Sequence, residues 1–250
     1  MKNVVFLGSK QIGLACLKIL YQHTQEYNYK IVGVLTNKRG TEILNFCDKK
    51  SIKVLSNLDE YLKIEKVDIA ISVQYHEILK EEHIRKAKEI IVNLHMAPLP
   101  EYRGCNQFSF AIYNDENEFG ATIHKLEAGI DSGAIIAQEK FSIPGNITVM
   151  QLYDKTVDCS INLFKNSISD ILLGKINLVE QCKIKTGKET HFYYRKDIEW
   201  LKKINLNMNE NTIDRILRAT SMNGFEPPYI EIKNKKVYLI PESQFKKEDN

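Results

Sequence analysis

The chain has 250 residues, which is enough for one sizeable hydrophobic core and a smaller second lobe. Its 35 basic and 32 acidic residues leave a net charge of +3, which argues against the basic stripe of a nucleic-acid binder but allows one local anion pocket. No stretch approaches the roughly 20 apolar residues that span a bilayer. The five cysteines form neither a CxxC pair nor a Cys/His cluster with zinc spacing. We therefore expect a cytoplasmic protein with free thiols, no membrane segment and no bound metal.

Short apolar runs alternate with amphipathic stretches between residues 1 and 95. The runs predict strands at 3–7, 29–35, 52–55, 68–73 and 89–93, and the stretches predict helices at 12–21, at 42–49 and in the charged segment before the last strand. Strands that alternate with helices are typical of a parallel sheet covered on both faces. The expected fold class is therefore α/β, with a doubly wound, mostly parallel, Rossmann-like sheet.

The second half of the chain changes character after one long helix. A helix is expected at 105–113, strands at 120–126 and 134–141, and an amphipathic helix at 149–173 that ends at Gly174. His124 alternates with apolar neighbours in its strand and is interpreted as a packed histidine. Tyrosine and phenylalanine then become frequent, and 229–233 with 236–240 predict a hairpin across Asn234. We divide the chain into a main domain over 1–180 and a small C-terminal α+β lobe over 185–250.

Three polar side chains are expected to meet at one edge of the sheet. Asn93 and His95 stand two residues apart where the strand at 89–93 ends, so both point to the same face. The carboxyl ends of parallel strands are where α/β sheets bind ligands. Two prolines and a glycine follow within Pro98–Gly104 and hold that loop rigid. A second polar loop, 127–133, can bring Asp131 to the same crevice.

An amide, an imidazole and a carboxylate suit the transfer of an acyl group to an amine. The attack of an amine on a formyl carbon creates an oxyanion and releases a proton. Asn93 can donate to the oxyanion, His95 can exchange protons near neutral pH, and Asp131 can orient and support the imidazolium. The amine is the nucleophile, so no serine or cysteine is required. By residue pattern alone, a structural role for the three side chains remains an equal alternative.

One turn near the N-terminus is a candidate anion site. Gly8, Ser9 and Lys10 follow the first predicted strand and open the first helix, where backbone N–H groups can bind an anion. The GxGxxG fingerprint of a dinucleotide site is absent, so we exclude an NAD enzyme.

The segments NLHMAPLPEYRG at 93–104 and LEAGIDSGAI at 126–135 resemble the folate-dependent formyltransferase family. That family combines Asn-x-His, a proline-rich loop ending in YRG and a later Asp in a glycine loop. The segment SVQYHEIL at 72–79 resembles the family's strand and loop beside the folate pocket. The resemblance covers residues 1 to about 150.

The resemblance implies roles for particular residues. Asn93, His95 and Asp131 would be the catalytic triad, and N10-formyltetrahydrofolate would be the formyl donor. The implied cofactor-binding residues are Tyr75, His76, Ile78, Leu79, Leu126, Gly129 and Ile130. Met96 follows His95 where many relatives carry a different pair of residues, and it favours the branch that acts on dTDP-linked amino sugars.

The C-terminal lobe bears on the acceptor. Glycinamide ribonucleotide enzymes of the family end sooner, and methionyl-tRNA enzymes carry a larger basic domain, so a sugar nucleotide fits this tail best. A dTDP-sugar needs an aromatic ring for thymine and cations for pyrophosphate. The expected substrate-binding residues are Gly8, Ser9, Lys10, Met96, Tyr102, Arg103, Arg195, Phe225 and Tyr229, with Tyr193 and Tyr194 as rival rings and Lys196 as a further cation.

The expected activity is formylation of dTDP-4-amino-4,6-dideoxyglucose for a surface polysaccharide such as the O-antigen of lipopolysaccharide. The 3-amino isomer is the first alternative, followed by glycinamide ribonucleotide or methionyl-tRNA, and then by a folate- or nucleotide-binding module without catalysis. By resemblance to the family, we also expect a homodimer in which the tyrosine-rich lobe takes part.

Overall fold

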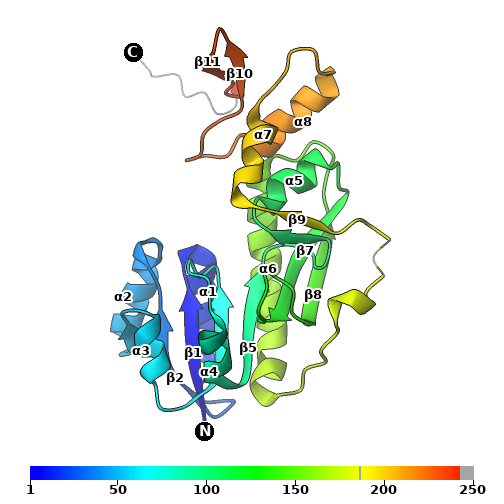
Figure 1. Ribbon diagram of the computed structural model, residues 1–250. Helices are drawn as coiled ribbons and strands as arrows, with labels where there is room; N and C mark the ends of the chain where they lie inside the picture. The colour runs from blue at the N-terminus through cyan, green and yellow to red at the C-terminus, as the bar shows by residue number, and fades with distance from the viewer. Residues whose placement is uncertain (186, 243–250) are drawn as a thin grey trace.

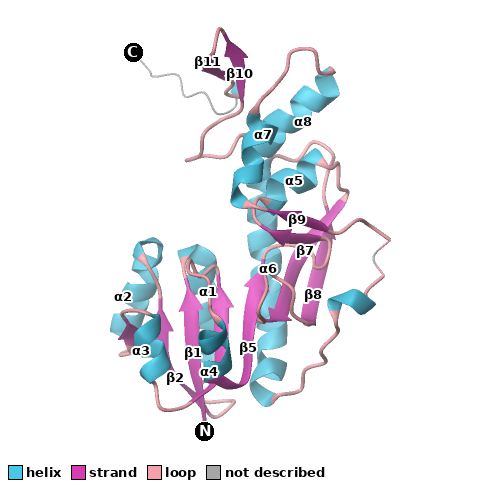
Figure 2. Cartoon of the chain, in the orientation of Figure 1, coloured by secondary structure: helices cyan, strands magenta, loops and turns pink. Residues whose placement is uncertain are grey.

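The protein is described by a computed structural model that covers residues 1–185 and 187–242. Seven strands form one sheet in the order β3-β2-β1-β4-β5-β7-β8 (Figures 1 and 2). The first five of these are parallel, while β7 runs antiparallel to both β5 and β8. The strands are β1 (Lys2–Gly8), β2 (Tyr29–Leu35), β3 (Val54–Leu55), β4 (Val67–Val73), β5 (Ala87–His95), β7 (Glu118–Lys125) and β8 (Ile135–Ser142). This order confirms the doubly wound, mostly parallel sheet.

Helices cover both faces of the sheet because its strands are apolar on both sides. The helices α1 (Lys10–Gln22), α2 (Thr41–Lys49) and α6 (Val149–Leu173) share one buried cluster with β1, β4 and β5. The helices α3 (Leu58–Lys63) and α4 (Glu81–Lys86) cover the other face. Each large aliphatic side chain buried in these layers contributes about 1.5–3 kcal/mol to folding. The layers fix the carboxyl ends of the strands on the side where the C-terminal lobe lies (Figure 1).

The long helix α6 begins and ends at residues with clear capping chemistry. The Thr148 hydroxyl accepts a hydrogen bond from the Gln151 N–H, and the Gln151 side chain accepts one from the Thr148 N–H. Gly174 ends the helix with a φ of 72°, a conformation that glycine adopts without steric cost. Both ends agree with the predicted range of 149–173.

The C-terminal lobe packs on the main domain through one shared cluster. The helices α5 (Gln107–Tyr113), α7 (Ile198–Lys202) and α8 (Glu210–Thr220) contribute Phe110, Leu201 and Ile216 to it. Short 3-10 turns lie at η1 (Lys38–Gly40), η2 (Gln181–Lys183) and η3 (Arg195–Asp197). The antiparallel hairpin of β10 (Tyr229–Ile232) and β11 (Lys235–Tyr238) lies at the far end of the lobe (Figure 1). The division into 1–180 and 185–250 stays our proposal.

A second small sheet joins the two regions. The strand β6 (Tyr102–Gly104) pairs in parallel with β9 (His191–Tyr193), so the loop after β5 lies beside the C-terminal lobe. Neither strand was predicted.

Among the helices of residues 1–185 and 187–242, none combines the length and the apolar character that a membrane span needs.

Candidate active site

The end of β5 brings Asn93 and His95 together, and β7 adds a third side chain. Asn93 lies directly opposite His124 in the antiparallel pair of β5 and β7. Residues opposite each other on antiparallel strands point to the same face. The Asn93 amide nitrogen lies 3.2 Å from Nε2 of His124, and Nδ1 of His124 donates to the Lys125 carbonyl at 2.9 Å. In the neutral ring, Nε2 of His124 therefore accepts from Asn93 and fixes the direction of its amide.

Asp131 reaches the same place from the loop after β7. Its Oδ1 atom lies 3.6 Å from Nδ1 of His95 and 3.6 Å from Nε2 of His124. Its Oδ2 atom accepts the Gly104 N–H at 3.0 Å. The backbone at Asp131 has a φ of 50° and at Gly129 a φ of 132°, so the loop turns sharply to deliver the carboxylate. The three predicted catalytic side chains thus form one cluster.

A glutamine from the connection after α6 holds the Asp131 loop. The Gln181 amide nitrogen donates to the carbonyls of Asp131 and Gly133, each at 2.8 Å. Its Oε1 atom accepts two hydrogen bonds from the Arg103 guanidinium, at 3.1 and 2.7 Å. The guanidinium and the loop of Asp131 are therefore tied through one buried side chain.

The protonation states follow from burial and from neighbouring charges. Burial lowers the pKa of His95, and His124 lowers it further, against the opposing effects of the Asp131 carboxylate and the Tyr102 carbonyl. Burial alone would raise the pKa of Asp131, but His95, His124 and the Gly104 N–H outweigh it and hold the pKa well below its usual value. At neutral pH the site therefore holds a neutral His95 beside an ionised Asp131.

The hydrogen bonds also assign the two nitrogens of His95. Nε2 lies 2.8 Å from the Tyr102 carbonyl, which can only accept, so Nε2 carries the hydrogen. Nδ1 is left to take up or release a proton, and it faces the Asp131 carboxylate. An imidazolium formed there gains a counter-ion, while the Asn93 amide supplies a donor for an oxyanion.

Several residues expected at a cofactor site lie beside the loops of the cluster. Tyr75, Leu79 and Leu126 pack together against the second face of the sheet. Ile78 and Ile130 are 85% and 49% exposed, so each offers apolar surface beside these loops. His76 lies on the loop after β4, as Ile78 does, and its Nε2 atom is 3.3 Å from the Glu77 carboxylate.

The predicted anion turn lies at the switch point of the sheet, between β1 and β4. The Ser9 N–H donates to the Val73 carbonyl at 3.2 Å, and the Lys10 amine donates to the Gln74 side chain at 3.0 Å. A cavity of about 310 Å³ opens beside the turn and is lined by Lys10, Gln11, Arg39, Gly40, Thr41, Glu42 and Ile43. Burial first, and then the Arg39 charge, lower the pKa of Lys10.

The other predicted substrate residues are spread over the molecule. Met96 and Tyr102 are each 1% exposed and belong to the hydrophobic clusters. Phe225, at 65% exposed, lies in the connection between α8 and β10. Arg195 is exposed at η3, whereas the Tyr229 ring lies under the Lys236 amine, 4.3 Å from its centroid. These residues do not form one pocket in the described structure.

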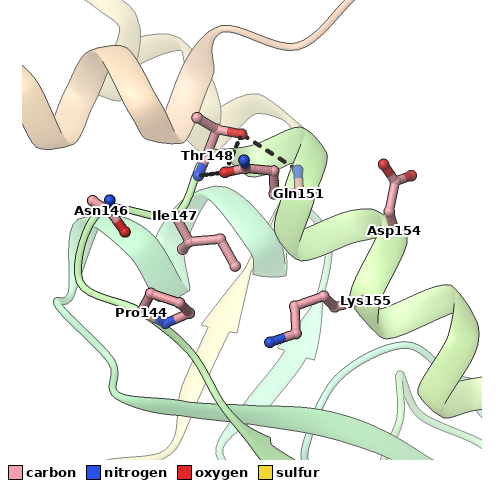
Figure 3. Close-up of a pocket in the computed structure, with 7 residues that line it drawn as sticks. All are labelled: Pro144, Asn146, Ile147, Thr148, Gln151, Asp154 and Lys155. Atoms are coloured by element: carbon pink, nitrogen blue, oxygen red, sulfur yellow. Dashed lines mark hydrogen bonds between the residues drawn. The ribbon is translucent and has the colours of Figure 1, made fainter.

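A larger cavity lies at the start of α6, away from the predicted residues. Its volume is about 530 Å³, and it is lined by Pro144, Asn146, Ile147, Thr148, Gln151, Asp154 and Lys155 (Figure 3). Thr148 and Gln151 are engaged with each other in the helix cap (Figure 3). None of the predicted site residues lines this cavity.

Three residues of the Asp131 cluster and the Lys10 cavity were not among the predicted site residues: His124, Gln181 and Arg39. His124 is buried, as predicted, but it also contacts Asn93 and Asp131, so its interpretation as a packed histidine was incomplete. Gln181 and Arg39 carry no sequence signal of their own. The register of β5 against β7, which brings His124 to Asn93, is a property of the folded sheet.

The sequence as a whole is similar to a known protein family. The profile of the formyl transferase family matches residues 2–168. The chain belongs to this family. One relative is the bifunctional polymyxin resistance protein ArnA of Wigglesworthia glossinidia brevipalpis. It is 31% identical to this chain over 238 residues, and the match covers 88% of this chain and 34% of the relative. GDP-perosamine N-formyltransferase of Brucella melitensis biotype 1 is 29% identical over 174 residues, covering 70% and 64%.

This formyl transferase therefore spans about a third of one relative and less than two thirds of the other. A solved structure with a similar fold is the N-formyltransferase from Helicobacter canadensis in complex with folinic acid and dTDP-3-aminofucose. The two share 25% identity with a TM-score of 0.77, over 95% of this chain and 86% of that chain.

Proposed function

We propose that the protein transfers a formyl group from N10-formyltetrahydrofolate to the amine of a dTDP-linked amino-deoxy sugar. The observation that carries this proposal is the cluster of Asn93, His95 and Asp131 on the same edge of the sheet as the cationic cavity of Lys10 and Arg39. The preferred acceptor is dTDP-4-amino-4,6-dideoxyglucose, and the product would enter a surface polysaccharide such as the O-antigen of lipopolysaccharide.

The reaction forms one C–N bond and breaks another. The sugar amine attacks the formyl carbon, and the carbonyl oxygen takes up negative charge that the Asn93 amide stabilises. The amine gives up one proton, the bond from the formyl carbon to N10 of the folate breaks, and N10 receives a proton. Neutral His95, with Nδ1 facing Asp131, is placed to carry the proton between the two nitrogens.

The folate is proposed to lie between the loop after β4 and the loop after β7. Tyr75, Leu79 and Leu126 give that region an apolar floor, and Ile78 with Ile130 offers exposed apolar surface for the pterin. His76 and Gly129 lie on the same two loops. The Helicobacter canadensis relative, whose complex contains folinic acid, supports a folate as the donor.

The pyrophosphate is proposed to bind at the switch point of the sheet. Open α/β sheets bind ligands where the strand order reverses, and the Lys10 amine and Arg39 approach the same cavity there. Two cations, Lys10 and Arg39, line the cavity against one carboxylate, Glu42, so the lining carries a net positive charge that favours an anion. The helices α1 and α2 also begin at this cavity, which favours an anion further. Arg195 and the exposed Phe225 ring are proposed to contact the nucleotide from the C-terminal lobe, with Tyr229 as the alternative ring.

Replacing Lys10 or Arg39 with methionine should raise the KM for the dTDP-sugar by about 10-fold or more and leave the KM for the folate unchanged. A hydrogen bond to a charged group contributes about 1.5–3 kcal/mol, which corresponds to a factor of roughly 10 to 100. Steady-state kinetics with each substrate varied in turn would measure this. Lys38→Met is the matched control, because Lys38 is an exposed neighbour that does not line the cavity. Equal effects of all three variants would contradict the assignment.

Incubation with dTDP-4-amino-4,6-dideoxyglucose and with the 3-amino isomer, each with N10-formyltetrahydrofolate, tests the substrate. Mass spectrometry should detect the gain of one formyl group on the 4-amino sugar. The 3-amino isomer is the second candidate, because the Helicobacter canadensis relative was crystallised with dTDP-3-aminofucose. No gain on either sugar would refute the proposal.

Methionyl-tRNA and glycinamide ribonucleotide are the remaining enzymatic alternatives. Methionyl-tRNA formyltransferases occur among the relatives. Residues 185–250 contain 13 basic and 10 acidic residues, however, and this small excess is not the concentrated positive surface that RNA binding needs. A folate- or nucleotide-binding module would bind both ligands without turnover of any acceptor.

We also propose that the protein is a cytoplasmic homodimer. All five cysteines are free thiols, as expected in a reducing compartment. The hairpin of β10 and β11 carries Ile232, Val237 and Tyr238, each at least 43% exposed, and such apolar side chains gain by pairing with a second copy. Analytical ultracentrifugation at micromolar concentration should give the mass of two chains.

A further inference from the structure

The backbone of β6 holds both partners of the catalytic pair. The Tyr102 carbonyl accepts from Nε2 of His95 at 2.8 Å, and the Gly104 N–H donates to Oδ2 of Asp131 at 3.0 Å. The two atoms lie two residues apart in a three-residue strand. The geometry of His95 and Asp131 therefore depends on where β6 lies.

Within the described residues, β6 pairs with one strand, and that strand comes from the C-terminal side of α6. Tyr102 is opposite His191, and Gly104 is opposite Tyr193. The pairing continues at both ends, because the His191 N–H donates to the Glu101 carbonyl at 2.7 Å and the Cys105 N–H donates to the Tyr193 carbonyl at 2.8 Å.

Side chains fix the same contact. The Asn106 amide donates to the carbonyls of Tyr194 and Arg195, each at 3.1 Å, just after β9 ends. The Tyr193 ring stacks on Phe110 with a centroid distance of 3.6 Å. Gly104 allows the close approach, since a Cβ built on it would lie 2.2 Å from the Tyr193 carbonyl oxygen.

We infer that β9 is a positioning strand for catalysis: residues 191–195 hold β6 where its backbone fixes the proton-carrying pair of His95 and Asp131. Arg195, at the end of this segment, is one of the residues proposed to contact the nucleotide, so the same segment joins the nucleotide end of the substrate to the catalytic centre. Only the link between the nucleotide end of the substrate and the catalytic centre rests on the proposed function. The position of β9 against β6 is independent of the acceptor.

Two substitutions displace β9 by different means. Gly104→Ala places a methyl group against the Tyr193 carbonyl, and Gly174→Ala is its matched control, because Gly174 also has a positive φ but its Cβ would meet nothing within 4 Å. Asn106→Asp removes the donor that binds Tyr194 and Arg195 without touching a catalytic side chain. Its control is Asn57→Asp, where the side chain only accepts a hydrogen bond and aspartate does the same.

Two readouts apply to the full-length protein. Proton NMR should show a downfield resonance for the hydrogen on Nε2 of His95, assigned by its absence from His95→Asn protein. We expect this resonance to be lost or shifted in Gly104→Ala and Asn106→Asp and unchanged in both controls. In the same two variants kcat should fall by about 10- to 100-fold, the loss that a misplacement of about 1 Å causes, while the KM for the folate changes little.

Each result decides the inference. An unchanged resonance and kcat in folded Asn106→Asp protein would overturn it, and so would equal losses in Gly104→Ala and Gly174→Ala, because strain would then explain both. The resonance requires no substrate. A wild-type protein that formylates no amino sugar would refute the proposed function and leave this test intact.

Discussion

His95→Asn should lower kcat by about 10³-fold while the binding of dTDP and of 5-formyltetrahydrofolate changes little. General acid–base catalysis by a placed side chain contributes roughly 10²- to 10⁴-fold. Asparagine can still donate to the Tyr102 carbonyl, but it cannot take up the proton that Nδ1 of the buried, neutral imidazole accepts beside Asp131. Initial rates at saturating substrates and isothermal calorimetry measure the two quantities separately.

His23→Asn is the control for this experiment. His23 lies at the end of α1 and contacts Glu26 on the surface, so the same change of side chain there should leave kcat intact. A fall of less than tenfold in His95→Asn would exclude His95 as the proton carrier. A protein that binds both ligands but shows no turnover before substitution would be a binding module.

Asp131→Asn should lower kcat by about 10²- to 10⁴-fold, since it removes the charge that supports the imidazolium and keeps an acceptor for the Gly104 N–H. It should also change the response to acid. The pKa of Asp131 is depressed in the folded protein, so the unfolded chain, with a carboxyl pKa of about 3.9, binds the proton first. The stability from this carboxylate is therefore present above that pH and is lost as the pH falls below it.

Urea denaturation at a series of pH values would measure the second effect. The free energy of unfolding of Asp131→Asn should fall less steeply between roughly pH 5 and pH 2 than that of the unmodified protein. Asp68→Asn is the control. Burial alone would raise the pKa of the Asp68 carboxyl, but the Asn3 N–H and the Lys66 amine outweigh it, so this pKa is lowered as well. Asp68 lies at the start of β4, whereas Asn93 and His95 lie at the end of β5. The Asp68→Asn change should flatten the same pH dependence and leave kcat unchanged. A loss of kcat in Asp68→Asn equal to that in Asp131→Asn would assign both effects to general destabilisation.

The parallel half of the fold could be predicted because its strands and helices carry strong local patterns. Tyr29–Leu35 is a run of apolar and β-branched residues, and Val149–Leu173 has helical periodicity with a capping threonine and a terminal glycine. Both have the bounds that the sequence predicted. Asn93 and His95 could be placed near each other for the same reason, since both belong to a strand whose end was visible in the sequence.

The short elements around the site could not be predicted. Tyr102–Gly104 and His191–Tyr193 have three residues each, which is too few for a period, and their partners lie far apart in the chain. To predict the contact of His124 with Asn93, one would need the register of β5 against β7. To predict the place of Arg39, one would need to know that two loops meet at one cavity. These are long-range relations, which local sequence patterns do not encode.

The pairing of β6 with β9 also bears on the protein during its synthesis. A nascent chain that has emerged only as far as α6 already has the three proposed catalytic side chains and the sheet that carries Asn93 and His95. It lacks residues 191–193, and so it lacks the strand that pairs with β6. Because domains fold progressively from the N-terminus on the ribosome, the active centre takes its final geometry only once the C-terminal lobe has emerged. On the proposed function, chains that have not yet reached Tyr193 would be unable to transfer the formyl group.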